Sequence, residues 1–208
     1  QLLRAAEQLF AEHGIANTPT RTITQAAGQR NESALHYHFG GRHGLISALH
    51  EKRTEQIQSR RLEILHTELE KNAAPPLRKL CEIMLQPIIE LAREDNGFID
   101  YLKIIGEIAF NTRQDLTNEI KHHETRSLQE IRPLVAKHLK HVPKQVAHIR
   151  IETIARFIIM SISQRAHQTE PFQGDEAALY LNNIIDNMAA MLAAEVSPAT
   201  LGSMKGEG

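Results

Sequence analysis

Residues 18–39 read TPTRTITQAAGQRNESALHYHF, and this stretch decides the fold. Thr18 followed by Pro19 is typical of a helix start, with the threonine as the cap and the proline in the first turn. Gly28 ends this short helix, and a second one is predicted over about residues 33–39. Two short helices joined by a glycine-containing turn are typical of a helix-turn-helix.

A further helix precedes this pair. Residues 2–13 read LLRAAEQLFAEH, in which Leu2, Ala6, Leu9 and Phe10 repeat at helical spacing before Gly14 stops the pattern. We therefore predict three helices before residue 40.

The rest of the sequence predicts longer helices separated by proline, glycine and asparagine. They cover about residues 42–70, 77–92, 98–110, 115–140, 146–167 and 176–195, with bends at Pro87 and Pro133. No alternating strand pattern occurs. The predicted fold is all-α: a helix-turn-helix domain over residues 1–47, a larger helical effector-binding and dimerisation domain over 48–195, and a flexible tail over 196–208.

Composition narrows the class of protein. Hydrophobic residues make up 41% of the 208 residues, which is enough for a sizeable core, whereas aromatic residues make up 4% and there is no Trp. The single cysteine excludes an internal disulfide framework, and Cys81 is most simply a buried apolar residue, although a thiol-reactive role stays open. No apolar run is long enough to cross a bilayer and no signal peptide is evident, so we expect a cytoplasmic protein without a membrane partner.

Charge is unevenly distributed. Residues 1–61 contain eight Lys or Arg and five Asp or Glu, although the whole chain has a net charge of −1. A basic bias of this size is weak evidence for a polyanionic partner, because ordinary surface variation produces it about as often.

The N-terminal residues resemble those of the TetR family of transcriptional regulators. LLRAAEQLFAEHG over residues 2–14 resembles the first helix of that family, TPTRTITQAAG over 18–28 its second helix and turn, ALHYHF over 34–39 the end of its recognition helix, and GRHGL over 41–45 the start of its fourth helix. Between Gly28 and His38 the chain carries one residue more than the commonest pattern. The register around residues 29–32 therefore stays open.

The resemblance implies a set of DNA-contacting residues, of which Thr20 matches a phosphate contact and Arg21 a base contact. His36, Tyr37 and His38 match a stretch of the family in which aromatic and imidazole groups bind phosphates or pack on a thymine methyl group. Ser33 and Arg42 suit DNA by their chemistry, because a hydroxyl can donate to a phosphate or a base edge and a helix N-terminus favours an anion. The full set is Thr20, Arg21, Ser33, His36, Tyr37, His38 and Arg42.

Two further sites are predicted from apolar helices. A mostly apolar cavity for an effector is expected between the helices of residues 77–110, although plain core packing explains the same residues nearly as well. Its candidate residues are Met84, Ile88, Phe98, Tyr101 and Ile105, with Glu107 added if it faces inward. Residues 151–162 and 179–192 are apolar on more than one face, which suits a dimer interface made by Phe157, Leu181, Ile185 and Met188. Full burial of both helices in a single core is the alternative.

The sequence thus predicts a homodimeric, ligand-responsive regulator that binds double-stranded DNA at a palindromic operator. A repressor released by an apolar or amphipathic effector is the first hypothesis, and an activator or a ligand-independent regulator is the alternative. A helical enzyme or ligand-binding protein that does not bind DNA is the rival from another class. No nucleophile, phosphate-binding or zinc motif occurs, so no catalytic residue, cofactor or metal is predicted.

Overall fold

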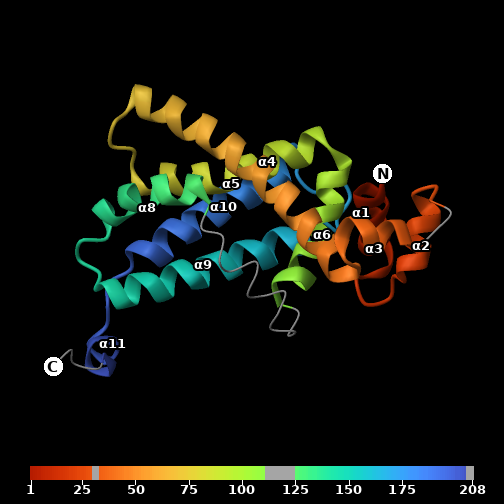
Figure 1. Ribbon diagram of the computed structural model, residues 1–208. Coiled ribbons are helices and arrows are strands. Elements are labelled where there is room, and N and C mark those ends of the chain that lie inside the picture. Colours follow the sequence, from red (N-terminus) through yellow and green to blue (C-terminus); the bar gives the residue numbers. More distant parts are fainter. Residues whose placement is uncertain (30–32, 111–124, 205–208) are drawn as a thin grey trace.

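The computed structural model describes residues 1–29, 33–110 and 125–204, and these residues form helices and no strand (Figure 1). The all-α prediction is therefore confirmed. The helices are α1 (Leu2–His13), α2 (Thr20–Ala26), α3 (Ser33–Phe39), α4 (Arg42–Lys71), α5 (Leu77–Glu94), α6 (Asn96–Phe110), α8 (Arg126–His138), α9 (Lys144–Arg165), α10 (Gly174–Ala193) and α11 (Pro198–Ser203).

The first three helices form a small unit, here called the head. Its apolar side chains meet in one core, in which Phe10 of α1, Ile23 of α2 and Leu35 of α3 are at most 1% exposed. Gly28 has φ +71°, a left-handed conformation that allows the chain to leave α2 sharply. α2 and α3 are thereby held as a helix-turn-helix.

The predicted capping role of Thr18 is wrong. α2 begins at Thr20 with Pro19 as its cap residue, and no side chain caps that end. Thr18 is buried, and its hydroxyl lies 3.2 Å from the carbonyl oxygen of Leu9 and 2.8 Å from that of Gly14. Thr18 lies between α1 and α2, so its hydroxyl could bind either helix. It binds backbone carbonyl groups at the end of α1.

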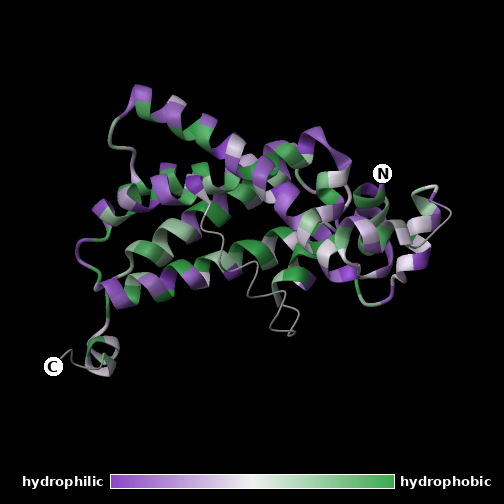
Figure 2. Cartoon of the chain, viewed as in Figure 1, coloured by the Kyte–Doolittle hydropathy of each residue, from purple (hydrophilic) through white to green (hydrophobic). Residues whose placement is uncertain are grey.

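The helices α4 to α10 form a larger unit, here called the body. α4 is the long element that leaves the head and packs on α5 and α8, while α10 packs on α5 and α9 (Figure 1). Apolar residues lie along the sides of these helices that face one another, and polar residues alternate with them along the sequence (Figure 2). Of the helix predicted over 115–140, residues 126–138 are helical, and 115–124 lie outside the described residues.

Within the predicted tail, residues 198–203 form the short helix α11. Ser197 caps this helix by accepting a hydrogen bond from the backbone N–H of Thr200 at 3.2 Å, and Pro198 occupies the first turn. Serine before proline is a strong local start signal that works without tertiary contacts.

A buried ion cluster joins the head to the body. Arg53 of α4 donates to both carboxylate oxygens of Glu7 of α1, from Nε at 2.7 Å and from Nη2 at 2.6 Å. Its Nη1 donates to Asp95 at 2.9 Å, and its guanidinium lies 5.2 Å from the centre of the Phe98 ring. Glu7 and Arg53 are only 2% and 3% exposed. Burial opposes the charge of Arg53, but Glu7 and Asp95 together raise its pKa above the ordinary value.

α6 makes the second connection between head and body, because it packs against α1 on one side and α9 on another. The carboxylate of Glu107 accepts a hydrogen bond from the backbone N–H of Ile15 at 2.9 Å, so this residue faces the head and not the predicted cavity. Near the start of α6, a Cβ on Gly97 would lie 1.8 Å from Nη1 of Arg4. A side chain at position 97 would therefore displace the end of the Arg4 side chain.

We predict that Arg53→Met lowers the free energy of unfolding by about 3–5 kcal/mol, because it leaves the Glu7 carboxylate buried without its partner. Chemical denaturation of the purified chain measures this loss. The double variant Glu7→Leu with Arg53→Met is expected to recover much of it, since the uncompensated charge is then gone.

Arg60→Met is the matched control, because Arg60 lies on the same helix and binds Glu90 and Glu94 nearer the surface. Its effect should be much smaller. Equal losses for Arg53→Met and Arg60→Met would contradict the role given to the buried cluster.

Candidate DNA-binding site

The second helix of the helix-turn-helix presents polar and aromatic side chains outward. Leu35 of α3 is fully buried, which turns the next three residues, His36, Tyr37 and His38, toward the surface. Tyr37 is 86% exposed, and its ring packs edge-on against that of His38 with centroids 5.2 Å apart. A large aromatic side chain so exposed on a short helix lacks any role in the core of the chain.

The other predicted contacts surround this helix. Arg21 is exposed on α2 and Thr20 is partly exposed at the start of that helix. Ser33 is exposed at the first position of α3. These residues share the helix-turn-helix with Tyr37, whereas the register left open around residues 30–32 falls outside the described residues.

Arg42 is less available than the sequence suggested. It starts α4, but its guanidinium lies 5.8 Å from the centre of the Phe10 ring, and its Nη2 is buried without a hydrogen-bond partner. A contact of Arg42 with a phosphate thus remains a prediction, and its packing on Phe10 gives it a structural role as well.

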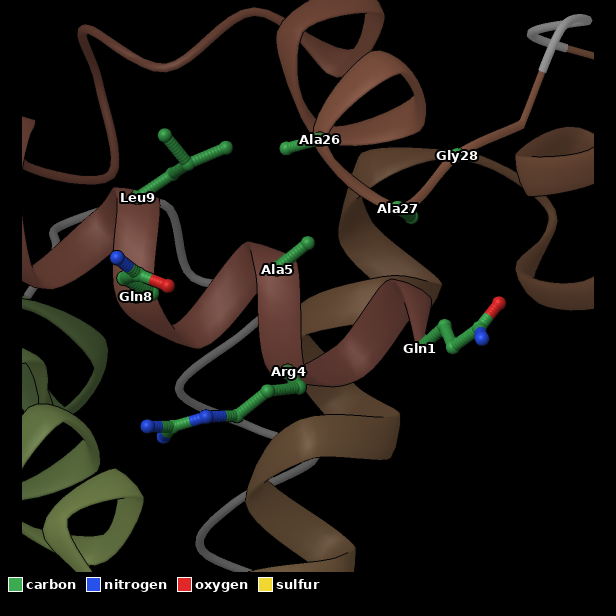
Figure 3. Close-up of a pocket in the computed structure, with 8 residues that line it drawn as sticks. All are labelled: Gln1, Arg4, Ala5, Gln8, Leu9, Ala26, Ala27 and Gly28. Carbon is green, nitrogen blue, oxygen red and sulfur yellow. The ribbon is translucent and has the colours of Figure 1, made fainter.

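An open depression lies on the head between α1 and the end of α2, with a volume of about 540 Å³ (Figure 3). Small and polar side chains line it, among them Ala5, Gln8 and Ala26. None of the residues predicted for DNA or for an effector lies in this depression.

The structure does not gather the five predicted effector residues around one space. Phe98 and Tyr101 are buried at the junction with the head, where the two rings pack edge-on and the Tyr101 hydroxyl lies 2.9 Å from Nδ1 of His50. Burial raises the pKa of Tyr101. Ile105 is buried on α6, whereas Met84 and Ile88 are partly exposed on α5. Phe98 and Tyr101 therefore hold α4 and α6 together.

Three of the four residues predicted for the dimer interface are buried within the single chain. Leu181, Ile185 and Met188 are buried inside the single chain, with Met188 at 0% exposed, because this side of α10 packs on α5 and α9. Phe157 is partly exposed. The apolar side chains of α9 and α10 that do reach the surface are Ile149, Ile151, Met160 and Leu179, of which Leu179 is 73% exposed.

Several charged residues with clear roles were missed by sequence analysis, namely Glu7, Arg53 and Arg61. Each stands at a position where the helical repeat calls for an apolar residue, such as Arg61 between Ile57 and Leu65. A charged residue in an apolar stripe was the available signal.

The remaining chemistry of the described residues is sparse. Cys81 is fully buried, and burial raises the pKa of its thiol to about 11 although Arg78 acts in the opposite direction. Within residues 1–29, 33–110 and 125–204, no three metal-binding side chains lie close enough to hold an ion. No helix in these ranges has the length and apolar character needed to span a membrane.

Comparison with known proteins agrees with this geometry. The family described as bacterial regulatory proteins, tetR family, matches residues 2–49. No curated protein matches the sequence at a significant level. Among solved structures, the fatty acid degradation regulator FadR from Bacillus halodurans is similar with a TM-score of 0.59, and the match covers 94% of this chain and 98% of that chain. At 14% identity this likeness shows the fold alone.

The match over residues 2–49 coincides with α1 to α3 and the first turns of α4, which are the elements that build the helix-turn-helix. Residues 2–49 therefore form a DNA-binding domain of the type found in the tetR family of bacterial regulatory proteins.

Proposed function

We propose that the protein is a homodimeric regulator of transcription that binds a palindromic operator and releases it when an effector binds the body. The outward row of His36, Tyr37 and His38 on α3 carries the DNA-binding part of this proposal. A recognition helix in the major groove needs such side chains at its surface, where they donate to phosphates or pack on thymine methyl groups. A regulator of this kind acts in the cytoplasm, and no catalytic residue is assigned.

We assign the dimer interface to a face of α9 and α10 that carries exposed apolar side chains. Ile149, Met160 and Leu179 are 59%, 53% and 73% exposed, which is unusual for large apolar side chains on adjoining helices. A second copy of the chain would cover them in a symmetric contact. Two heads would then face two half-sites of the operator.

Coupling between the effector and DNA follows from the two connections of the head. α4 holds Glu7 through Arg53, and α6 holds the Ile15 backbone through Glu107. A ligand that shifts either helix within the body would reorient both heads and disturb their spacing on the operator. Repression with release by the ligand is the direction that we propose.

Selection of binding sites from random double-stranded DNA tests the central part of the proposal. We expect enrichment of an inverted repeat, with affinity that falls as salt rises by a log-log slope of about −0.9 for each neutralised phosphate. A folded protein that enriches no sequence would exclude specific DNA recognition.

His38→Ala is expected to weaken binding to the selected site and to random DNA by similar factors, because a phosphate contact carries no sequence information. Arg21→Ala should instead change the preference at particular base pairs by about 1–3 kcal/mol. Fluorescence anisotropy with the selected site and single-base variants measures both effects. His148→Ala is the control, since His148 is an exposed histidine on α9. Identical losses on all DNA for both head variants would show that Arg21 does not read bases.

Leu179→Glu is expected to favour monomers and to reduce operator affinity strongly, because it places a charge in the proposed interface. Sedimentation velocity measures the association state. Leu201→Glu serves as the control, because Leu201 is an exposed leucine on α11 and lies outside this face. A dimer that persists in Leu179→Glu would place the interface on another surface.

A further inference from the structure

Arg61 is a buried arginine at the meeting point of three helices of the body. It stands on α4 and is 8% exposed. Its Nη1 donates to the hydroxyl of Ser127 on α8 at 3.2 Å, and its Nη2 donates to the backbone carbonyl of Met84 on α5 at 3.0 Å. The same three helices run side by side in the body (Figure 1).

The guanidinium of Arg61 has no counter-charge in the described part of the chain. Both of its acceptors are neutral, and no carboxylate of those residues lies within 4 Å of it. Its Nε is buried and has no hydrogen-bond partner among the residues that the structure describes. A neutral acceptor would satisfy this N–H but would leave the positive charge uncompensated.

The neighbouring Arg60 shows what an ordinary arginine of this helix does. Arg60 is paired with Glu90 at 3.0 Å and with Glu94 at 2.9 Å, and hydrogen bonds to these carboxylates raise its pKa above the ordinary value. Burial instead lowers the pKa of Arg61 to about 10, so it still carries its charge at neutral pH. Acidic residues of α5 thus pair with the more exposed Arg60, and none of those described pairs with the buried Arg61.

A buried charge is stabilised by an anion with matching geometry, and a guanidinium binds a carboxylate through two parallel hydrogen bonds. Apolar residues stand close to Arg61 along α4 and α5. Leu65 lies one turn along α4 and is fully buried, while Met84 and Ile88 share one side of α5 and are partly exposed. The surroundings therefore suit a ligand with one acidic group and an apolar chain.

We propose that Arg61 binds the carboxylate of an amphipathic monoanionic effector whose apolar part lies against Met84 and Ile88. This inference rests on the proposed function in one respect, that the body binds an effector.

The position of Arg61 also connects the ligand to the head. Arg61 contacts both α5 and α8, and a carboxylate paired with its Nε and Nη2 would compete with the Met84 carbonyl for Nη2 and displace α5. Arg61 follows Arg53 by eight residues of the same helix, which corresponds to ~12 Å of rise. Arg53 holds Glu7 of α1. A shift of α4 at Arg61 would thus reach the head directly.

The test uses the full chain without DNA and three probes with the same apolar chain: octanoate, octan-1-ol and octylamine. Isothermal titration calorimetry and thermal unfolding measure binding. Octanoate is expected to bind the unmodified chain at least about tenfold more tightly than octan-1-ol, which corresponds to ~1.4 kcal/mol, and octylamine should bind more weakly still. Arg61→Met should abolish the preference for octanoate.

Two further variants test whether Arg61→Met loses the preference for octanoate only because the body is disturbed. Arg60→Met removes the same charge from the adjacent position and should keep the preference for octanoate. Arg61→Lys keeps the charge without the planar pair of donors, so it should bind octanoate more weakly than the unmodified chain but still prefer it to octan-1-ol. Without ligand, Arg61→Met should unfold at the same temperature as the unmodified chain or a higher one, because it removes an unpaired buried charge.

Equal binding of octanoate and octan-1-ol, or a preference for octanoate that survives Arg61→Met, would overturn the inference. So would the failure of all three probes to bind a chain that still binds its selected DNA, and the proposed DNA-binding function would then stand. Conversely, octanoate binding that depends on Arg61 but leaves DNA affinity unchanged would support the site and contradict release by the effector.

Discussion

The bidentate pair between Glu7 and Arg53 is the interaction on which the arrangement of the molecule depends. It is the most deeply buried ion pair between the head and the body in the described residues, and Asp95 and Phe98 enclose it from the body side. A buried charge tolerates little change of geometry, because any displacement leaves it without its partner in a medium of low polarity. The head is therefore held in a defined orientation on α4, which a regulator needs if its affinity for DNA is to depend on the body.

Three arginines of α4 differ in their burial and in their pairing with carboxylates. Arg53 is buried and paired, Arg60 is near the surface and paired, and Arg61 is buried and lacks a carboxylate among the described residues. Arg53 holds the head in place. Arg60 belongs to an ion-pair network near the surface that contributes little to stability. Arg61 is the residue that we assign to binding an anionic effector. One helix thus connects the proposed ligand site to the DNA-binding unit.

The sequence predicted the head well because its signals are local. Helical spacing in α1, the turn at Gly28 and the run that ends at Phe39 each depend on a few adjacent residues. The sequence also predicted that α9 and α10 carry apolar residues on more than one face. It could not predict which of these residues face the core and which face the surface. Met188 and Leu179 differ only in their direction around α10, and the packing of α5 and α9 decides which of them is buried. Likewise, the binding of Glu107 to the Ile15 backbone joins residues 92 positions apart, and no local pattern predicts it.

Photo-crosslinking from position 37 tests the central claim most directly. Tyr37 is replaced by p-benzoylphenylalanine, and the variant is irradiated on the DNA site obtained by selection. Because Tyr37 is exposed on α3, the account predicts crosslinks at two positions related by the symmetry of the inverted repeat. The same analogue at Leu179 should crosslink the second protein chain and not the DNA. Crosslinks to DNA from position 179 with none from position 37 would contradict the assignment of α3 as the helix that contacts the operator.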